Sequence, residues 1–183
     1  PKPSSAASDV YKRQVSNFDF AASGSALCYE DYNVSEKINH IDGMTVEEAE
    51  HMMATKLYQN NAKVHFNHFV EKGGRFGKRI VYGGHVISLT RALTFNGLSN
   101  AFKIIAINGG THASPCFAGT TVFAWSTILD KIEVSDKLGA LRIRSNGIGD
   151  AQAYQFQHRD ANNRFDSSVL LSLDYWALIP RKN

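Results

Sequence analysis

The chain has 183 residues, and 43% of them are hydrophobic, which is enough to bury the core of one domain. The formal net charge of +3 is a weak indication of an anionic partner. No stretch approaches the roughly 20 apolar residues that cross a bilayer, and the start lacks the apolar core of a signal peptide. We therefore expect one domain and no membrane partner.

The first 14 residues are set apart from the rest of the chain. Ser4–Gln14 reads SSAASDVYKRQ, which matches the translation of a transposase-type sequencing adaptor. We therefore expect residues 1–14 to be a disordered library artefact and exclude them from the fold. Three of the 20 basic residues and one of the 17 acidic residues lie there, so the remainder is close to neutral and predicts no nucleic-acid partner.

Residues 15–28 are mostly small and polar, and this composition predicts the remnant of an interdomain linker. Because the adaptor-like sequence ends next to Val15, we expect that the natural reading frame was cut there and that a preceding domain was lost. Cys28 and Cys116 lie far apart without metal-type spacing. We expect reduced thiols in a cytoplasmic protein, although the sequence leaves a disulfide between them open.

The first helix is expected over residues 46–57. Thr45 and Glu48 have the spacing of a capping box, with Thr45 as the N-cap. Four apolar residues at helical spacing then form one face. They are Val46, Ala49, Met53 and Leu57. Residues 60–80 are polar and rich in glycine, which predicts a loop.

A second helical periodicity begins at Gly83-Gly84. Val86, Leu89 and Leu93 share one face of this run. It predicts the central helix of the domain, ending near Gly97 or Asn100.

The remainder of the chain predicts strands. Residues 103–108 and 120–132 are rich in β-formers, and Leu141–Arg144 alternates apolar and charged side chains. Residues 146–166 are expected to form a hairpin with a polar loop. One apolar face at period two follows, made of Val169, Leu171, Leu173, Tyr175, Ala177 and Ile179. A long helix followed by three or four antiparallel strands predicts an α+β fold in which the helix covers that face.

Three segments carry residues suited to chemistry. His65 follows Asn60 in a polar loop, where an imidazole near an amide could hold and deprotonate a water, although such a histidine is usually solvated. Gly83 and Gly84 could let a ligand approach free N–H groups at a helix start, or could form only a tight turn. Pro115–Gly119 is best interpreted as a plain strand connection, in which Cys116 is not favoured as a nucleophile.

In this order, the three segments resemble the MaoC-like dehydratase family over roughly residues 29–180. Family members carry an Asp, then Asn-Pro, and a His five residues after the Asp. They also carry a His-Gly pair at the start of the central helix and a Pro-x-x-x-Gly-Asp corner. Asn60 stands at the Asp position and His65 at the His position, Gly83-Gly84 at the pair, and Pro115 to Thr120 at the corner. The resemblance implies a hot-dog domain over 29–183, in which an antiparallel sheet wraps a long central helix, and a lyase that hydrates or dehydrates an acyl-CoA.

Within the family, residues 82–102 and 107–125 are similar to the second of two hot-dog units fused in one chain. This narrower resemblance implies a branched C5 dicarboxylyl substrate, mesaconyl-CoA or β-methylmalyl-CoA. Coenzyme A is then part of the substrate, and no separate cofactor is expected. A lone unit would expose a sheet edge and an apolar face, so we expect a homodimer or pairing with a lost first hot-dog half.

Three departures from the family pattern affect the site. Asn60 replaces the Asp, Lys63 the Pro and Gly83 the His. An amide can orient a water but cannot take its proton at neutral pH. Our hypothesis is that His65 acts as base and later acid, that Asn60 positions the water, and that the Gly84 N–H polarises the thioester carbonyl. A carboxylate from the missing half would be an alternative base.

Four further residues complete the expected substrate-binding set: Gly83, His85, Arg75 and Arg79. The arginines could meet the phosphates of coenzyme A, although solvated surface is their more usual role, and His85 is as readily a neutral packing residue. His65, His68 and His85 match no standard metal motif, so no metal is expected.

Two other functions remain open from the sequence. A hot-dog thioesterase would hydrolyse the thioester. Such enzymes typically use a carboxylate near the central helix, and Gly83–Arg91 contains no Asp or Glu. A non-catalytic half that only binds substrate is the second alternative, and Asn60 is the residue that favours it.

Overall fold

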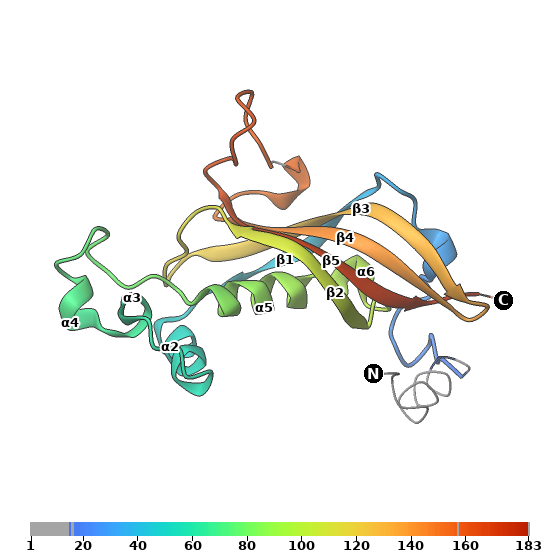
Figure 1. Cartoon of the computed structure of the whole chain (residues 1–183), viewed down its shortest axis with the longest axis horizontal. Coiled ribbons are helices and arrows are strands. Elements are labelled where there is room, and N and C mark those ends of the chain that lie inside the picture. Colours follow the sequence, from blue (N-terminus) through green and yellow to red (C-terminus); the bar gives the residue numbers. More distant parts are fainter. Residues whose placement is uncertain (1–14, 16, 157, 183) are drawn as a thin grey trace.

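The chain folds around one antiparallel sheet. The computed structural model describes residue 15 and residues 17–156 and 158–182, so the expectation for residues 1–14 lies outside the described residues. In the described part, five strands pair in the order β1-β3-β4-β5-β2, and helix α5 lies along one face of the sheet (Figure 1). This arrangement is the α+β fold that the sequence predicts.

The elements of the described chain, in order, are η1 (Tyr29–Asp31), β1 (Lys37–Thr45), α2 (Glu48–Leu57), α3 (Lys63–Phe66), α4 (His68–Glu71), α5 (Gly83–Leu93), α6 (Phe95–Leu98), β2 (Lys103–His112), β3 (Thr121–Ser135), β4 (Leu138–Gly149), η2 (Ala153–Gln155) and β5 (Val169–Pro180). The four predicted strands are present, and each is longer than predicted. Residues 146–149 continue β4, so the predicted start of the hairpin segment at residue 146 was wrong. The segment that follows connects the antiparallel strands β4 and β5 and contains an antiparallel bridge between Arg159 and Phe165. None of the described helices is long and apolar enough to cross a membrane.

Strand β1 has no counterpart in the prediction. It pairs with β3, and its register shifts between His40 and Gly43. Its residues beyond His40 are exposed, so the sequence lacks the regular alternation that identifies a half-buried strand. The strand is therefore formed by its partner rather than by its own pattern.

The core lies between α5 and the sheet. Val86 and Leu93 of α5 are buried, and the six apolar residues predicted for one face of β5 are all buried. Leu141 and Ile143 of β4 point into the same core, while Arg142 and Arg144 stay partly exposed beside Asp174. The predicted alternation in both strands is confirmed. A smaller apolar cluster around Trp125 packs against the segment between β4 and β5.

Helix α2 departs from its prediction in both start and orientation. Its N-cap is Glu47, because Thr45 ends β1 and its hydroxyl bonds to the Thr121 hydroxyl at 2.8 Å. The predicted capping box is therefore wrong. Met53 and Leu57 are each 69% exposed, and α2 buries the opposite side. The buried residues are His51, Ala54 and Thr55.

The central helix is shorter than predicted. Helix α5 ends at Leu93, and the backbone at Asn96 and Gly97 is not helical. Gly97 has φ +100°, and a Cβ there would lie 2.8 Å from the Ile38 side chain. The Tyr32 hydroxyl donates to the Gly97 carbonyl at 2.7 Å. Glycine is needed for this bend, which brings α6 against β1.

A buried polar chain crosses four neighbouring strands beneath α5. His40 Nε2 lies 2.7 Å from the Ser126 hydroxyl, which lies 2.8 Å from the Ser145 hydroxyl. That hydroxyl lies 3.1 Å from the Tyr175 hydroxyl. Burial lowers the pKa of His40 to about 4, so its ring is neutral at neutral pH. Each group is satisfied by the next, and this fixes the relative positions of the strands.

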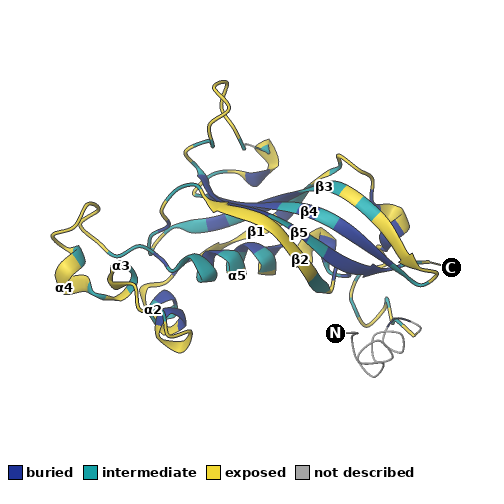
Figure 2. Cartoon of the chain, viewed as in Figure 1, coloured by how far each residue is buried: buried dark blue, intermediate teal, exposed yellow. Residues whose placement is uncertain are grey.

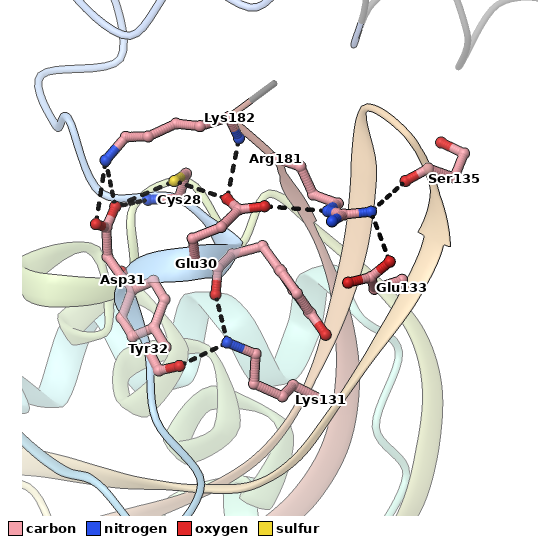
Figure 3. Close-up of polar contacts among 10 residues, drawn as sticks. Cys28, Glu30, Asp31, Tyr32, Lys131, Glu133, Ser135, Arg181 and Lys182 are labelled. Carbon is pink, nitrogen blue, oxygen red and sulfur yellow. Dashed lines mark hydrogen bonds and ion pairs between the residues drawn. The ribbon is translucent and has the colours of Figure 1, made fainter.

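An ion-pair cluster joins the start of the described domain to its last strand (Figure 3). We use this name for Glu30, Asp31, Glu133, Arg181 and Lys182. Arg181 bridges Glu30 at 3.1 Å and Glu133 at 3.0 Å, and the Lys182 ammonium lies 2.8 Å from Asp31. The cluster therefore holds η1 against the end of β5. Next to it, Cys28 is buried with a free thiol, as is Cys116 in the β2–β3 connection.

Acid should weaken this attachment. Burial alone would raise the pKa of Glu30, but hydrogen bonds from the Lys182 N–H and the Cys28 thiol outweigh it and lower that pKa to about 2. The Lys182 ammonium and Cys28 lower the pKa of Asp31 to about 2. Because both folded-state pKa values are depressed, the stabilisation is complete above the ordinary values of 4.5 and 3.8 and is lost as the pH falls toward 2.

We expect the double substitution Glu30→Gln with Asp31→Asn to lower the urea midpoint at about pH 6 and to bring it close to the parent value at about pH 2. Urea denaturation at a series of pH values measures this. Glu47→Gln, at an exposed glutamate outside the cluster, is the control. A constant difference between parent and double variant across the pH range would contradict the account.

Candidate active site

A pocket of about 390 Å³ opens at the start of α5. Its walls come from three parts of the chain: α3, the segment that leads into α5, and the connection from β2 to β3. The lining residues are His65, Ile80, Val81, Tyr82, Gly83, Gly84, Val86, His112, Ser114, Pro115 and Cys116. Segments far apart in the sequence therefore converge on the first turn of the central helix.

Backbone hydrogen bonds hold these walls together. The Ile80 N–H donates to the Val64 carbonyl at 3.1 Å, which ties the segment before α5 to α3. The Val81 N–H donates to the Cys116 carbonyl at 2.8 Å, which ties the same segment to the β2–β3 connection. Because consecutive residues are anchored to both neighbours, the start of α5 is fixed between them.

The helix start presents free donors to the pocket. Tyr82 is the N-cap of α5, and its carbonyl accepts from the N–H groups of His85 and Val86. The N–H groups of Gly83 and Gly84 precede these and have no acceptor within the helix. The first turn contains no acidic residue, so the positive end of the helix dipole is not neutralised by its own side chains. Such a site favours an oxygen that gains negative charge.

His65 is held with one nitrogen available as a base. Its Nδ1 lies 3.0 Å from the Ile80 carbonyl oxygen. Because a carbonyl oxygen can only accept, Nδ1 carries the proton, and Nε2 bears the lone pair of the neutral ring. The ring also packs edge-on against Tyr82, with centroids 5.8 Å apart. The imidazole is thus oriented by two contacts at the pocket wall.

The two glycines leave space that aromatic rings occupy. A Cβ on Gly83 would lie 2.7 Å from His112 Nε2, and a Cβ on Gly84 would lie 2.6 Å from the ring carbons of Tyr82. Both distances are shorter than real Cβ contacts, so any side chain at either position would force a ring to move. The Gly-Gly pair is therefore more than a tight turn: it admits the two rings to the helix start.

His112 and Tyr82 were not singled out from the sequence. His112 ends β2, just before the Pro-containing corner. The one available signal is that this corner and the Gly-Gly pair both belong to the family resemblance, which would bring the end of β2 near the helix start. Burial lowers the pKa of His112 below its ordinary value of 6.5, and the nearby His65 lowers it further. Burial raises the pKa of Cys116 to about 11, which keeps this thiol protonated.

Four of the predicted site residues do not line this pocket. The Asn60 side-chain oxygen accepts from the Ala62 N–H at 2.9 Å, in a turn that leads into α3. His85 Nε2 lies 3.1 Å from Glu50 Oε1, in a separate groove between α2 and α5. The structure thus brings together His65, Gly83 and Gly84 of the predicted set, but neither Asn60 nor His85.

The two predicted arginines also lie elsewhere. Arg79 forms an ion pair with Glu48, and its side chain is 15% exposed. Arg75 is exposed, and its guanidinium stacks on the ring of Phe76 at 5.0 Å. Of the two arginines, Arg75 has no acidic partner among the described residues, whereas Arg79 is paired with Glu48. No group of three or more His, Cys, Asp or Glu side chains in the described part of the chain is arranged to hold a metal.

Comparison with known proteins gives two curated relatives. The chain is 52% identical over 174 residues to β-methylmalyl-CoA dehydratase of Chloroflexus aurantiacus, covering 94% of this chain and 49% of the relative. It is 52% identical over 166 residues to mesaconyl-CoA hydratase of Cereibacter sphaeroides, covering 90% and 47%. The chain therefore spans about half the length of the curated relatives it matches. No family model matches the chain.

Solved structures agree with this comparison. A MaoC domain protein dehydratase from Chloroflexus aurantiacus superposes with a TM-score of 0.88 at 54% identity, covering 92% of this chain and 48% of that one. A conserved protein of Mycobacterium tuberculosis described as having a double hot-dog fold superposes with a TM-score of 0.62 at 20% identity, covering 89% and 44%. The chain is a hot-dog domain that belongs to the MaoC-like dehydratase family.

Proposed function

We propose that the chain is one hot-dog unit of an acyl-CoA hydratase. This unit supplies His65 and the N–H groups of Gly83 and Gly84 to the active site. The observation that carries this proposal is the single pocket that contains the His65 imidazole and the free N–H groups of Gly83 and Gly84. Water addition to an enoyl thioester needs a base for the water and donors for the thioester oxygen, and this pocket supplies both.

The proposed reaction uses these groups in sequence. His65 Nε2 takes one proton from a water as the water oxygen bonds to Cβ of the enoyl thioester. The electron pair of the double bond moves toward the thioester oxygen, which the N–H groups at the start of α5 stabilise. His65 then returns the proton to Cα. Dehydration follows the same steps in reverse.

Mesaconyl-CoA and β-methylmalyl-CoA are the proposed substrate and product. The names of the two relatives, each 52% identical to this chain, support this choice. Asn60 is assigned a structural role here, because its amide holds the turn before α3 and does not reach the pocket.

Thioester hydrolysis is the less favoured reaction. The residues that line the pocket in the described structure include no Asp or Glu, the carboxylate that a hot-dog thioesterase would use. Incubation with mesaconyl-CoA and with a saturated acyl-CoA separates the two reactions, because only a thioesterase releases free coenzyme A thiol. A purely substrate-binding half would catalyse neither reaction.

We expect His65→Gln to lower kcat/KM for hydration of mesaconyl-CoA by about 10²- to 10⁴-fold, because glutamine cannot take the proton of the water. The assay uses the 183-residue chain combined with the remaining half of the Chloroflexus relative. His68→Gln is the matched control, since His68 is exposed on α4 and lies outside the pocket. Hydration by His65→Gln within twofold of the parent rate would refute the assignment of His65 as base.

A second hot-dog unit is the proposed partner. Strand β2 is an edge strand of the sheet and is exposed along most of its length (Figure 2). Ile107 is 63% exposed on this strand. Beside it, a groove of about 690 Å³ runs between the outer side of α5 and β2, lined by residues such as Ile87, Phe95 and Phe102. A strand whose outer edge has no neighbouring strand, next to an apolar groove, favours extension of the sheet by another unit.

We expect Ile107→Lys to raise the Kd of pairing by at least about tenfold, because the lysine would be buried in the proposed interface at the edge of β2. The partner is the remaining half of the Chloroflexus relative or a second copy of the chain. Sedimentation velocity measures this. Ile41→Lys is the control, since Ile41 is 72% exposed on β1, at the opposite edge of the sheet. An equal increase in Kd for both variants would show that the interface does not lie at the edge of β2.

A further inference from the structure

We propose that His112 is a second residue of the hydration site, whose ring accepts a hydrogen bond from the attacking water while His65 takes the other proton of that water. This inference rests on the function proposed above. It assigns a role to an imidazole that the sequence did not single out and that no part of the mechanism above uses.

The position of His112 is the first observation. Its ring occupies the space in front of the first residue of α5, because a Cβ on Gly83 would lie 2.7 Å from Nε2 and 2.9 Å from Cε1 of that ring. His65 reaches the same pocket from α3. Two imidazoles from different elements therefore face one space next to the free donors of the helix.

The unused hydrogen-bonding capacity of His112 is the second observation. Its ring makes no hydrogen bond or ion pair with any residue that the structure describes, whereas His65 and His85 each have such a partner. His112 is exposed at the end of β2, so its ring nitrogens are accessible to a water in the pocket. A water held between the two imidazoles would satisfy one of them.

The other polar side chains that line the pocket are those of Tyr82, Ser114 and Cys116. The Ser114 hydroxyl donates to the Ser167 carbonyl at 3.1 Å. The Cys116 thiol is a poor acceptor, and it keeps its proton. His112 is the lining residue with an unengaged nitrogen lone pair that could complete the orientation of a water aimed at a substrate carbon.

The role requires a neutral His112 and leaves the proton balance unchanged. One water proton passes to His65 and later to Cα, and the second stays on the new hydroxyl while His112 accepts a hydrogen bond from it. His112 neither gains nor loses a proton in the cycle. Burial and the neighbouring His65 favour its neutral form at neutral pH.

The pH dependence of kcat/KM provides a readout that a packing role would not move. If both imidazoles must be neutral, protonation of either one stops the reaction, so log kcat/KM should fall with a slope of about two at acid pH. The other titratable groups that line the pocket are Tyr82, from the segment before α5, and Cys116, from the β2–β3 connection. Burial raises the pKa of the Cys116 thiol, so it stays protonated over this limb. His51 of α2 lies outside the pocket lining, and burial together with His85 and His65 lowers its pKa.

The test compares His112→Asn and His112→Phe in the chain combined with the remaining half of the Chloroflexus relative. Asparagine keeps an acceptor without titrating, so we expect kcat to fall about tenfold, KM to change little and the acid slope to drop to about one. Phenylalanine fills the space without an acceptor and should lower kcat by about 10²-fold or more. His68→Asn, on exposed α4, serves as the control, and circular dichroism verifies folding of each variant.

The outcomes separate the two proposals. A parent that hydrates mesaconyl-CoA while His112→Phe keeps its kcat, or while His112→Asn keeps the parent slope, overturns the role of His112 and leaves the hydratase intact. A parent that hydrates no enoyl thioester overturns the hydratase proposal, and the role of His112 with it. In His112→Asn, a lower acid slope of log kcat/KM together with a lower kcat, at nearly constant KM, supports the proposal.

Discussion

Val86 and Leu93 bury one side of α5 against the sheet, and this packing positions nearly everything else in the domain. It places the polar chain from His40 to Tyr175 beneath the helix, where each hydroxyl has a partner on a neighbouring strand and His40 Nδ1 bonds to the Asn96 carbonyl of α6. It also brings the first turn of α5 to the end of β2. A shift of α5 along the sheet by one turn, about 5.4 Å, would separate the helix-start donors from both imidazoles.

Helix α5 begins with two glycines, and their missing side chains determine what can approach the start of the helix. Gly83 and Gly84 leave two N–H groups uncovered by their own residues and let the rings of His112 and Tyr82 approach closely. Alanine at either position would gain helix propensity, yet its Cβ would collide with a ring. The glycines therefore lower local helix propensity at the point where the two rings pack against the helix, and such a local conflict is typical of functional sites.

The sequence predicted those parts of the fold that depend on local periodicity. The apolar face of β5, the alternation in β4 and the start of α5 at Gly83 follow from spacing alone, and the structure confirms them. Strand β1 was missed because its pairing with β3 imposes its conformation, and its own residues do not alternate regularly. The apolar face of α2 was predicted to pack in the core, but it is exposed. Periodicity identifies an apolar helix face but does not identify the element that packs against it.

The same distinction applies to the candidate site. His65 and the Gly-Gly pair, which line one pocket, were predicted as site residues because short motifs carry them. The presence of His112 in the same pocket depends on where β2 ends relative to α5, which no local pattern encodes. Asn60 is the reverse case: the motif predicts a role at the site, whereas in the structure its amide oxygen accepts from the Ala62 N–H and the residue does not line the pocket.

The most direct measurement of the central claim is a crystal structure of the domain, combined with the remaining half of the Chloroflexus relative, with a bound saturated acyl-CoA that cannot be hydrated. The account predicts the thioester oxygen within hydrogen-bonding distance of the Gly83 or Gly84 N–H, with Cβ facing His65. A thioester bound in the groove between α5 and β2, away from both glycines, would contradict it.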